Sequence, residues 1–183
     1  MKTINICISS LTKTLVFSCL FLYSTFTFAQ SDIFEVSRNG SLEEIKAIYN
    51  QDKELVNSKN EQGYTPLTLA CYNGNLEVAS FLVEKVSDIN GNSNYGTPLM
   101  AAVYKSYDKI VTVLLKHNAN PNIQDSQGGT AMHYAVLFKK YEIIKLLIDA
   151  DADFNIQNNV KKSALDFAIS YKDEKLNELL NIK

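Results

Sequence analysis

The sequence predicts an all-α solenoid, in which paired antiparallel helices joined by protruding finger loops stack as five units. The first observation is a short motif, a hydroxyl residue followed by an apolar stretch, that recurs four times. Its hydroxyl residues are Thr65, Thr97, Thr130 and Ser163, at spacings of 32, 33 and 33 residues. The second observation is that apolar residues recur at fixed distances after each hydroxyl. Self-similarity at such a period indicates stacked helical repeats.

The first half of each repeat predicts a short inner helix. The four hydroxyl residues are of the type that caps a helix N-terminus by accepting a hydrogen bond from a free backbone N–H. Pro66 and Pro98 follow at the first helical position, where a missing N–H costs nothing. Two, five and six residues after the hydroxyl, apolar residues form a stripe that we expect to be buried. In two repeats these are Leu99, Ala102, Val103, Met132, Ala135 and Val136.

The second half of each repeat predicts an outer helix, over residues 75–85, 107–117 and 140–150. Apolar residues recur there at helical spacing, which marks one buried face. Thirteen residues after each hydroxyl they are Val78, Ile110, Ile143 and Leu176, and four residues further on Leu82, Leu114, Leu147 and Leu180. The turns that follow contain Asn57, Asn90, Asn122 and Asn155, each seven or eight residues before the next hydroxyl.

Over residues 31–183 this pattern resembles the ankyrin repeat family, whose repeats open with a Thr-Pro-Leu-His box. The segment Thr130-Ala-Met-His133 corresponds to that box. The resemblance implies that His133 hydrogen-bonds the box hydroxyl and a backbone carbonyl, tying adjacent repeats together. Thr68, Met100 and Asp166 occupy the histidine position in the other repeats. We therefore expect Thr65, Thr97, Thr130, His133 and Ser163 to be structural residues.

The two ends of the array depart from the repeat pattern in the way that caps do. The N-terminal unit lacks the box but keeps Asn39-Gly-Ser-Leu-Glu43 where the next has Asn73-Gly-Asn-Leu-Glu77. In the last unit Lys161 and Lys162 replace the finger glycine, and the predicted outer helix is polar, as a terminal cap requires. We expect one ankyrin-repeat domain over 30–183, with an N-terminal cap at 31–59, internal repeats at 60–90, 91–122 and 123–155, and a C-terminal cap at 156–183.

Residues 1–29 predict a Sec signal peptide that is cleaved. The stretch contains Lys2 and Lys13 but no acidic residue. An apolar run extends from Leu15 to Tyr23, and a small-x-small cleavage site lies at Thr27 to Ala29. The apolar run is shorter than the ~20 residues of a membrane-spanning helix. A lipoprotein signal would use Cys19, but the apolar stretch before Cys19 is too short. We expect the product to begin at Gln30, to be exported to the periplasm or medium, and to have no membrane span.

Without those residues the chain has 16 basic and 20 acidic side chains, a net charge of −4, and Cys71 as its one cysteine. No intramolecular disulfide can form, and Cys71 is expected in the core. Only Arg38 of the 18 basic residues is an arginine, the better reader of phosphate and guanine. We expect no nucleic-acid partner, and a monomer.

The sequence contains little that predicts enzymatic chemistry. It has no paired cysteines, phosphate-binding glycine loop or nucleophile elbow. Asp149, Asp151 and Asp153 alternate as in a calcium loop, but the glycine and the downstream glutamate are missing. We expect no catalytic residues, no metal and no cofactor. The alternative is a small-molecule hydrolase in which His133 works with Asp166, although no nucleophile is evident.

The resemblance implies that function lies in exposed side chains of a concave groove built from fingertips and inner helices. Seven and eight residues after the hydroxyl, aromatic and large apolar side chains recur, and Tyr72, Tyr104 and Leu137 share one offset. The alternative is that the tyrosines only cover the inner helices. The expected partner contacts are Tyr64, Tyr72, Asn73, Tyr104, Lys105, Leu137, Phe138 and Tyr171.

The expected function is that of a non-enzymatic module that binds one partner protein. Similar small exported ankyrin proteins of bacteria suggest two specific roles, an immunity-type inhibitor that masks a toxin and an accessory factor for an oxidative-stress enzyme. The residues leave both roles open.

Overall fold

The computed structural model describes residues 32–93 and 96–182, and the described residues from Ile33 onward form one compact unit. The predicted signal peptide lies outside the described residues. Within the described ranges the chain forms ten α helices, one 3-10 helix, η1 (Lys53–Asn57), and no strand longer than an isolated bridge. The prediction of an all-α fold is therefore confirmed.

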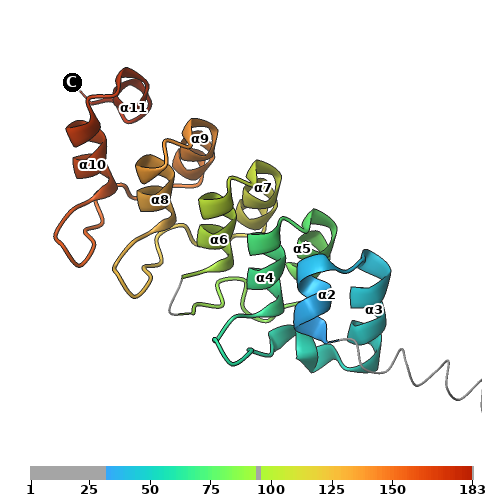
Figure 1. Cartoon of the computed structure of the whole chain (residues 1–183). Helices are drawn as coiled ribbons and strands as arrows, with labels where there is room; N and C mark the ends of the chain where they lie inside the picture. The colour runs from blue at the N-terminus through green and yellow to red at the C-terminus, as the bar shows by residue number, and fades with distance from the viewer. Residues whose placement is uncertain (1–31, 94–95, 183) are drawn as a thin grey trace, which may run out of the picture. The chain divides into compact units, whose positions relative to one another are not determined.

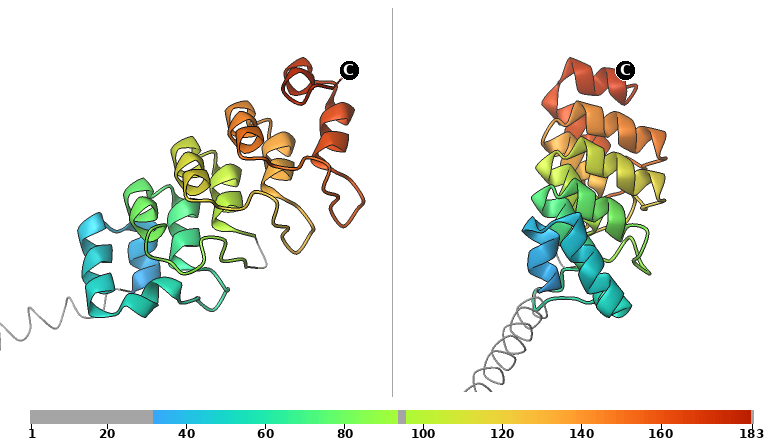
Figure 2. Two further views of the ribbon diagram at one scale, coloured as in Figure 1. Left: turned by 180° about the vertical axis from the view of Figure 1, so that it is seen from behind. Right: turned by 90° about the vertical axis from the view of Figure 1, so that its right-hand side faces the viewer.

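The helices alternate along the chain between two layers (Figure 1). The inner helices are α2 (Ile33–Asn39), α4 (Pro66–Asn73), α6 (Pro98–Lys105), α8 (Ala131–Leu137) and α10 (Ala164–Tyr171). The outer helices are α3 (Leu42–Gln51), α5 (Leu76–Leu82), α7 (Asp108–Lys116), α9 (Tyr141–Asp149) and α11 (Glu174–Leu179). Each helix packs against the next one of its own layer, so five helix pairs stack in a row, as Figure 2 shows from two further sides. This is the solenoid that the sequence predicts.

The inner helices begin where the hydroxyl residues predict. The N-caps of α4, α6, α8 and α10 are Thr65, Thr97, Thr130 and Ser163. Thr65 Oγ1 accepts a hydrogen bond of 3.1 Å from the Thr68 N–H, and Thr97 Oγ1 one of 3.3 Å from the Met100 N–H. Each side chain thereby satisfies a donor that has no partner within the helix.

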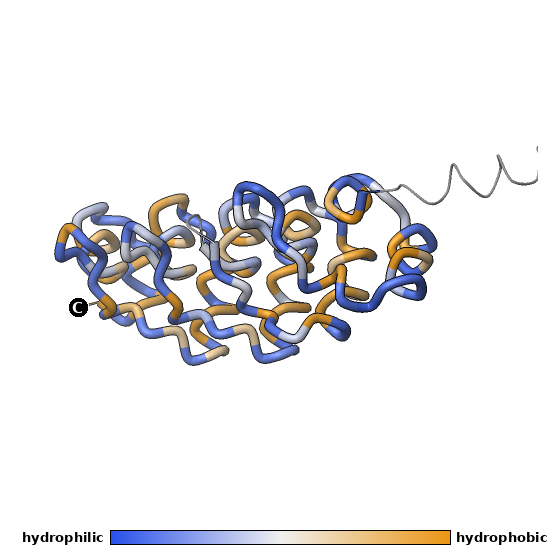
Figure 3. Tube along the Cα trace, turned by 90° about the horizontal axis from the view of Figure 1, so that it is seen from below, coloured by the Kyte–Doolittle hydropathy of each residue, from blue (hydrophilic) through white to orange (hydrophobic). Residues whose placement is uncertain are grey.

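The predicted apolar positions form the core. The inner-helix stripe residues of α6 and α8, and the outer-helix residues at both predicted offsets, are at most 5% exposed. Cys71 is completely buried, as expected. Figure 3 shows the hydrophobic residues recurring in each helix pair, whereas the loops between pairs are largely hydrophilic. Each pair buries its faces against its neighbours because it is too small to bury both alone.

Two sequence expectations about helix extent and burial are wrong. The outer helix expected over 75–85 ends at Leu82, and a turn follows. Ile169, the counterpart of buried Cys71, is 51% exposed. In α10 that face is not covered by a further helix pair among the described residues, so the same repeat position is exposed at the end of the array.

The asparagine of each of the first three turns bonds to the turn of the next repeat. Asn57 Oδ1 accepts from the Ser87 N–H, Asn90 Oδ1 from the Asn120 N–H, and Asn122 Oδ1 from the Asp153 N–H, each at 2.8 Å. This ladder crosses every junction between the turns and runs parallel to the stacked helices. It links successive repeats through backbone N–H groups of exposed turn residues.

Candidate functional site

His133 forms a hydrogen-bonded box with Thr130 and reaches the next finger. The Thr130 backbone N–H donates to His133 Nδ1 at 3.1 Å, and Thr130 Oγ1 lies 2.9 Å from the same nitrogen. Because a backbone N–H can only donate, Nδ1 is the acceptor and the ring hydrogen is on Nε2. Nε2 then donates to the Lys162 carbonyl oxygen at 3.1 Å. This bond joins α8 to the following finger. The His133 side chain is 2% exposed, so its ring does not face solvent.

Asp166 has the corresponding position in the last repeat and makes a similar box. Its Oδ2 accepts from the Ser163 N–H at 2.8 Å and from the Ser163 hydroxyl at 3.0 Å. These hydrogen bonds from Ser163 lower the pKa of Asp166. Both ring nitrogens of His133 are thus engaged, one in the cap of α8 and one with the Lys162 carbonyl, while the Asp166 oxygen is engaged in the cap of α10. The geometry does not pair the two residues as a base and its orienting acid.

The alternating aspartates form a turn. Asp153 Oδ1 accepts from the Asn155 N–H at 2.8 Å, while the Asp153 N–H donates to Asn122. Asp151 has a φ of +56°, the left-handed conformation at the end of α9. In residues 32–93 and 96–182, no group of three or more His, Cys, Asp or Glu side chains is arranged to hold a metal ion.

Exposed aromatic rings from three successive inner helices contact one another. Tyr72 of α4 and Tyr104 of α6 stack with ring centroids 6.5 Å apart and planes 11° apart. Phe138, directly after α8, meets Tyr104 edge to face at 5.4 Å. Tyr72, Tyr104 and Phe138 are 45%, 50% and 46% exposed. Large apolar side chains that are this exposed and also contiguous are a feature of binding surfaces.

A fourth ring, that of Tyr134, belongs to this cluster and is missing from the sequence-based set. It stacks on Phe138 at 6.5 Å and meets Tyr104 edge to face at 6.4 Å. The Tyr134 hydroxyl donates a hydrogen bond to Asp125 Oδ2. Burial, and then the hydrogen bond to Asp125, raise the pKa of Tyr134 above its usual range. The surface formed by Tyr72, Tyr104, Tyr134 and Phe138 is called the aromatic groove below.

Asp125 joins the aromatic groove to its finger loop. Its Oδ1 accepts from the Gln127 and Gly129 N–H groups, both at 2.8 Å. One carboxylate oxygen therefore closes the finger turn, while the other accepts the hydrogen bond from the Tyr134 hydroxyl.

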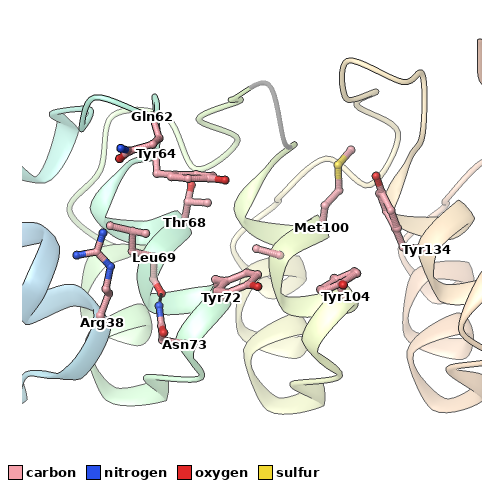
Figure 4. Close-up of a pocket in the computed structure, with 11 residues that line it drawn as sticks. Arg38, Gln62, Tyr64, Thr68, Leu69, Tyr72, Asn73, Met100, Tyr104 and Tyr134 are labelled. Carbon is pink, nitrogen blue, oxygen red and sulfur yellow. Dashed lines mark hydrogen bonds between the residues drawn. The ribbon is translucent and has the colours of Figure 1, made fainter.

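A pocket of about 710 Å³ opens beside the aromatic groove. Figure 4 shows Tyr72, Tyr104 and Tyr134 along its length, on three successive inner helices, and Met100 comes from the same helix as Tyr104. Its remaining lining comes from Arg38, Gln62, Tyr64, Thr68, Leu69, Asn73 and Ala101. Arg38 is the one charged side chain in that set.

The other expected contact residues take different positions. Tyr64 is half-buried and lines the pocket, and Asn73 lines it while its Nδ2 donates to the Leu69 carbonyl at 2.9 Å. Lys105 is exposed, with Nζ 4.8 Å from the centroid of the Tyr72 ring. Leu137 is 36% exposed. The next residue, Phe138, contacts the ring of Tyr104.

Tyr171 lies in a separate polar cluster at the junction with the last helix pair. Lys139 Nζ is 5.6 Å from the Tyr171 ring centroid and 2.8 Å from Asp173 Oδ2. The Tyr141 hydroxyl donates to the same oxygen at 2.9 Å. The hydrogen bond from Lys139, and then that from the Leu176 N–H, lower the pKa of Asp173 to about 2.

The comparison with protein families matches this architecture. The family profile described as ankyrin repeats (3 copies) matches residues 33–125 and 117–183, which together cover both layers of helices. The chain belongs to the ankyrin-repeat family. Ankyrin repeats are protein-interaction modules, and their function depends on side chains that are placed on the scaffold.

Relatives share the repeats within longer chains. Ankyrin repeat and SAM domain-containing protein 6 of Rattus norvegicus is 38% identical over 102 residues, 55% of this chain and 12% of that protein. Serine/threonine-protein kinase TNNI3K of Mus musculus is 33% identical over 87 residues, 42% of this chain and 10% of the kinase. Palmitoyltransferase akr1 of Neurospora crassa is 28% identical over 107 residues, 57% of this chain and 15% of the transferase. The chain therefore spans a small part of each of these relatives.

Across the ranges that the structure describes, every helix is too short or too polar to cross a bilayer.

Proposed function

We propose that this ankyrin-repeat protein is an exported, non-enzymatic module that binds a partner protein through the aromatic groove. The observation that carries the proposal is the contact of Tyr104 with Tyr72 on one side and Phe138 on the other, all about half exposed. Tyrosine side chains bury much area with few rotatable bonds and keep a polar tip, so they are frequent anchors of protein interfaces. Rings that already contact one another lose little further freedom on binding.

Replacing the exposed side chains of this surface by serine tests the proposal. We expect Tyr72→Ser, Tyr104→Ser, Leu137→Ser and Phe138→Ser, combined in one variant, to lose a partner that the natural protein captures from a native extract. The control variant carries Leu55→Ser and Lys109→Ser. Leu55 and Lys109 are also exposed, but they lie on η1 and α7, away from the aromatic groove. Circular dichroism should remain native in both. Equal capture by the two variants would contradict the proposal.

Export is part of the proposal and rests on the composition of residues 1–29. The mature protein should begin at Gln30 when it is expressed in its own host. Mass spectrometry of the intact protein from the periplasm or the medium tests this, and a product that begins at Met1 or carries a lipid on Cys19 would disprove it.

The identity of the captured partner separates the more specific roles. A toxin whose activity falls on binding would make this protein an immunity-type inhibitor. An oxidative-stress enzyme would make it an accessory factor. We expect a monomer that binds no nucleic acid, which light scattering and a retention assay with labelled oligonucleotides test.

A further inference from the structure

Charge is divided between the two layers of helices. The inner helices with the turns that follow them (33–40, 66–74, 98–106, 131–140 and 164–172) contain five basic residues, Arg38, Lys105, Lys139, Lys140 and Lys172, and two acidic ones, Glu35 and Asp166. The five outer helices contain the opposite excess, five basic and eight acidic residues. The inner side is therefore basic on a chain that is acidic overall.

The two acidic residues of the inner side are already engaged. Asp166 accepts two hydrogen bonds from Ser163. Glu35 accepts from Asn39 Nδ2 at 2.8 Å and lies 3.4 Å from Arg38 Nη1. Neither carboxylate is directed at the lysines of the inner helices.

Lys105 is the cation of this side that a partner could pair with most directly. Within the part of the chain that the structure describes, no carboxylate lies within ion-pair distance of its ammonium group. The Lys105 ammonium lies over the Tyr72 ring, at 4.8 Å from the ring centroid. Lys105 is also the residue directly after Tyr104 in the chain. Lys139, by comparison, is paired with Asp173. An open positive charge thus lies over the exposed Tyr72 ring of the aromatic groove.

We propose that the aromatic groove binds an acidic segment of a partner protein, with a carboxylate on Lys105 and a neighbouring aromatic or aliphatic side chain on the Tyr72 and Tyr104 rings. This inference rests on the proposed function and specifies the chemistry of the partner. The Lys105 ammonium can bind a carboxylate while it remains over the Tyr72 ring, because the cation–π contact uses one face of the ammonium. Arg38, in a surface pair with Glu35 at the far end of the pocket, adds a second and weaker positive charge.

A peptide fits this surface better than a nucleic acid does. A nucleic-acid strand presents a phosphate about every 3.4 Å and needs several unpaired cations along its path. Among the described residues, Lys105 is the one cation that lies over a ring of the aromatic groove, and the acidic outer helices repel a polyanion. An acidic segment needs only one or two complementary charges beside an apolar contact.

A phage-displayed library of random dodecapeptides tests the inference without knowledge of the partner. We expect selection on the natural protein to enrich peptides with aspartate or glutamate next to an aromatic or aliphatic residue. Lys105→Glu should weaken their binding about tenfold, because it replaces an attraction by a like-charge contact. Lys109→Glu is the matched control, since Lys109 is exposed on the outer helix α7, and it should leave binding unchanged.

The outcomes distinguish this inference from the proposed function. If the enriched peptides lose binding to Tyr104→Ser but are neutral or basic, the acidic-partner inference alone is overturned. Peptides that bind equally well to Tyr104→Ser would overturn both proposals. Dimers that Lys105→Glu dissociates would identify a second copy of this chain, with its acidic outer helices, as the occupant and would also overturn the inference.

Discussion

The Nε2 atom of His133 lies 3.1 Å from the carbonyl oxygen of Lys162, so a side chain of α8 bonds to the backbone of the finger that leads into α10. The other ring nitrogen accepts from the Thr130 N–H. One buried imidazole thus caps its own helix and connects it to the next repeat. Both bonds need the neutral tautomer that is protonated at Nε2.

His133→Ala should lower the free energy of unfolding by about 2–3 kcal/mol, because it leaves the buried Thr130 N–H and the Lys162 carbonyl without their partner. His133→Asn should lose about half of that amount, since its amide oxygen can still accept from Thr130 but cannot reach Lys162. Urea unfolding followed by circular dichroism measures both. His117→Ala, at the exposed end of α7, is the control. A folded His133→Ala variant that no longer binds the partner would contradict the structural role.

Gly128→Ala and Gly63→Ala form a matched pair at the same position of two fingers. Both glycines have left-handed φ angles, +74° and +81°. A Cβ at Gly128 would lie 2.8 Å from the backbone nitrogen of Asn159, whereas one at Gly63 meets nothing closer than 4.0 Å. We expect Gly63→Ala to cost about 1 kcal/mol for the backbone conformation alone, and Gly128→Ala about 2–4 kcal/mol because the next finger must also move. Similar losses in thermal or urea unfolding would show that the contact with Asn159 is unimportant.

Lys161→Gly should stabilise the protein. Lys161 has a φ of +59° at the finger position where Gly63 and Gly128 occur in other repeats. Glycine removes the steric cost of that conformation, and the net gain after its greater chain entropy is about 0.5–1 kcal/mol. Lys162→Gly is the neighbouring control and should destabilise by about 0.5 kcal/mol, because Lys162 has no positive φ. A urea midpoint that falls for Lys161→Gly would contradict the prediction.

Asp173 makes the stability of the last helix pair depend on pH in the acidic range. Its pKa in the folded protein is about 2, lowered from an ordinary 3.8 first by the hydrogen bond from Lys139. Because the folded pKa is the lower one, this stabilisation is complete above the ordinary pKa and is lost as the pH falls from about 4 to 2. The melting temperature of Asp173→Asn should be below that of the natural protein at neutral pH, and the difference should shrink in that acidic window. Glu84→Gln, at an exposed pair, is the control, and a difference that stays constant down to pH 2 would contradict the assignment.

The aromatic groove could be predicted in part, because the period of the repeat identifies which inner-helix positions face outward. Counting from the hydroxyl finds the exposed Tyr72, Tyr104 and Phe138. It does not find Tyr134, which lies only four residues after Thr130 and is half-buried. The sequence feature that could have identified Tyr134 is a tyrosine directly after His133, at a position outside the apolar stripe. Its contact with Asp125 depends on how the finger folds back onto α8.

The sequence by itself determined the repeat, the helix starts and the buried stripes of this protein, because caps and 3.6-residue periodicity act within a few residues of one another. Only the tertiary structure decided which side chains meet across repeats. His133 bonds to Lys162, Lys139 pairs with Asp173, and Tyr104 contacts Phe138. These partners are about one repeat apart in the chain, so their contacts depend on the offset and rotation between stacked helix pairs. A periodic pattern repeats each position identically and does not specify that geometry, which is also why Cys71 is buried while its counterpart Ile169 is exposed.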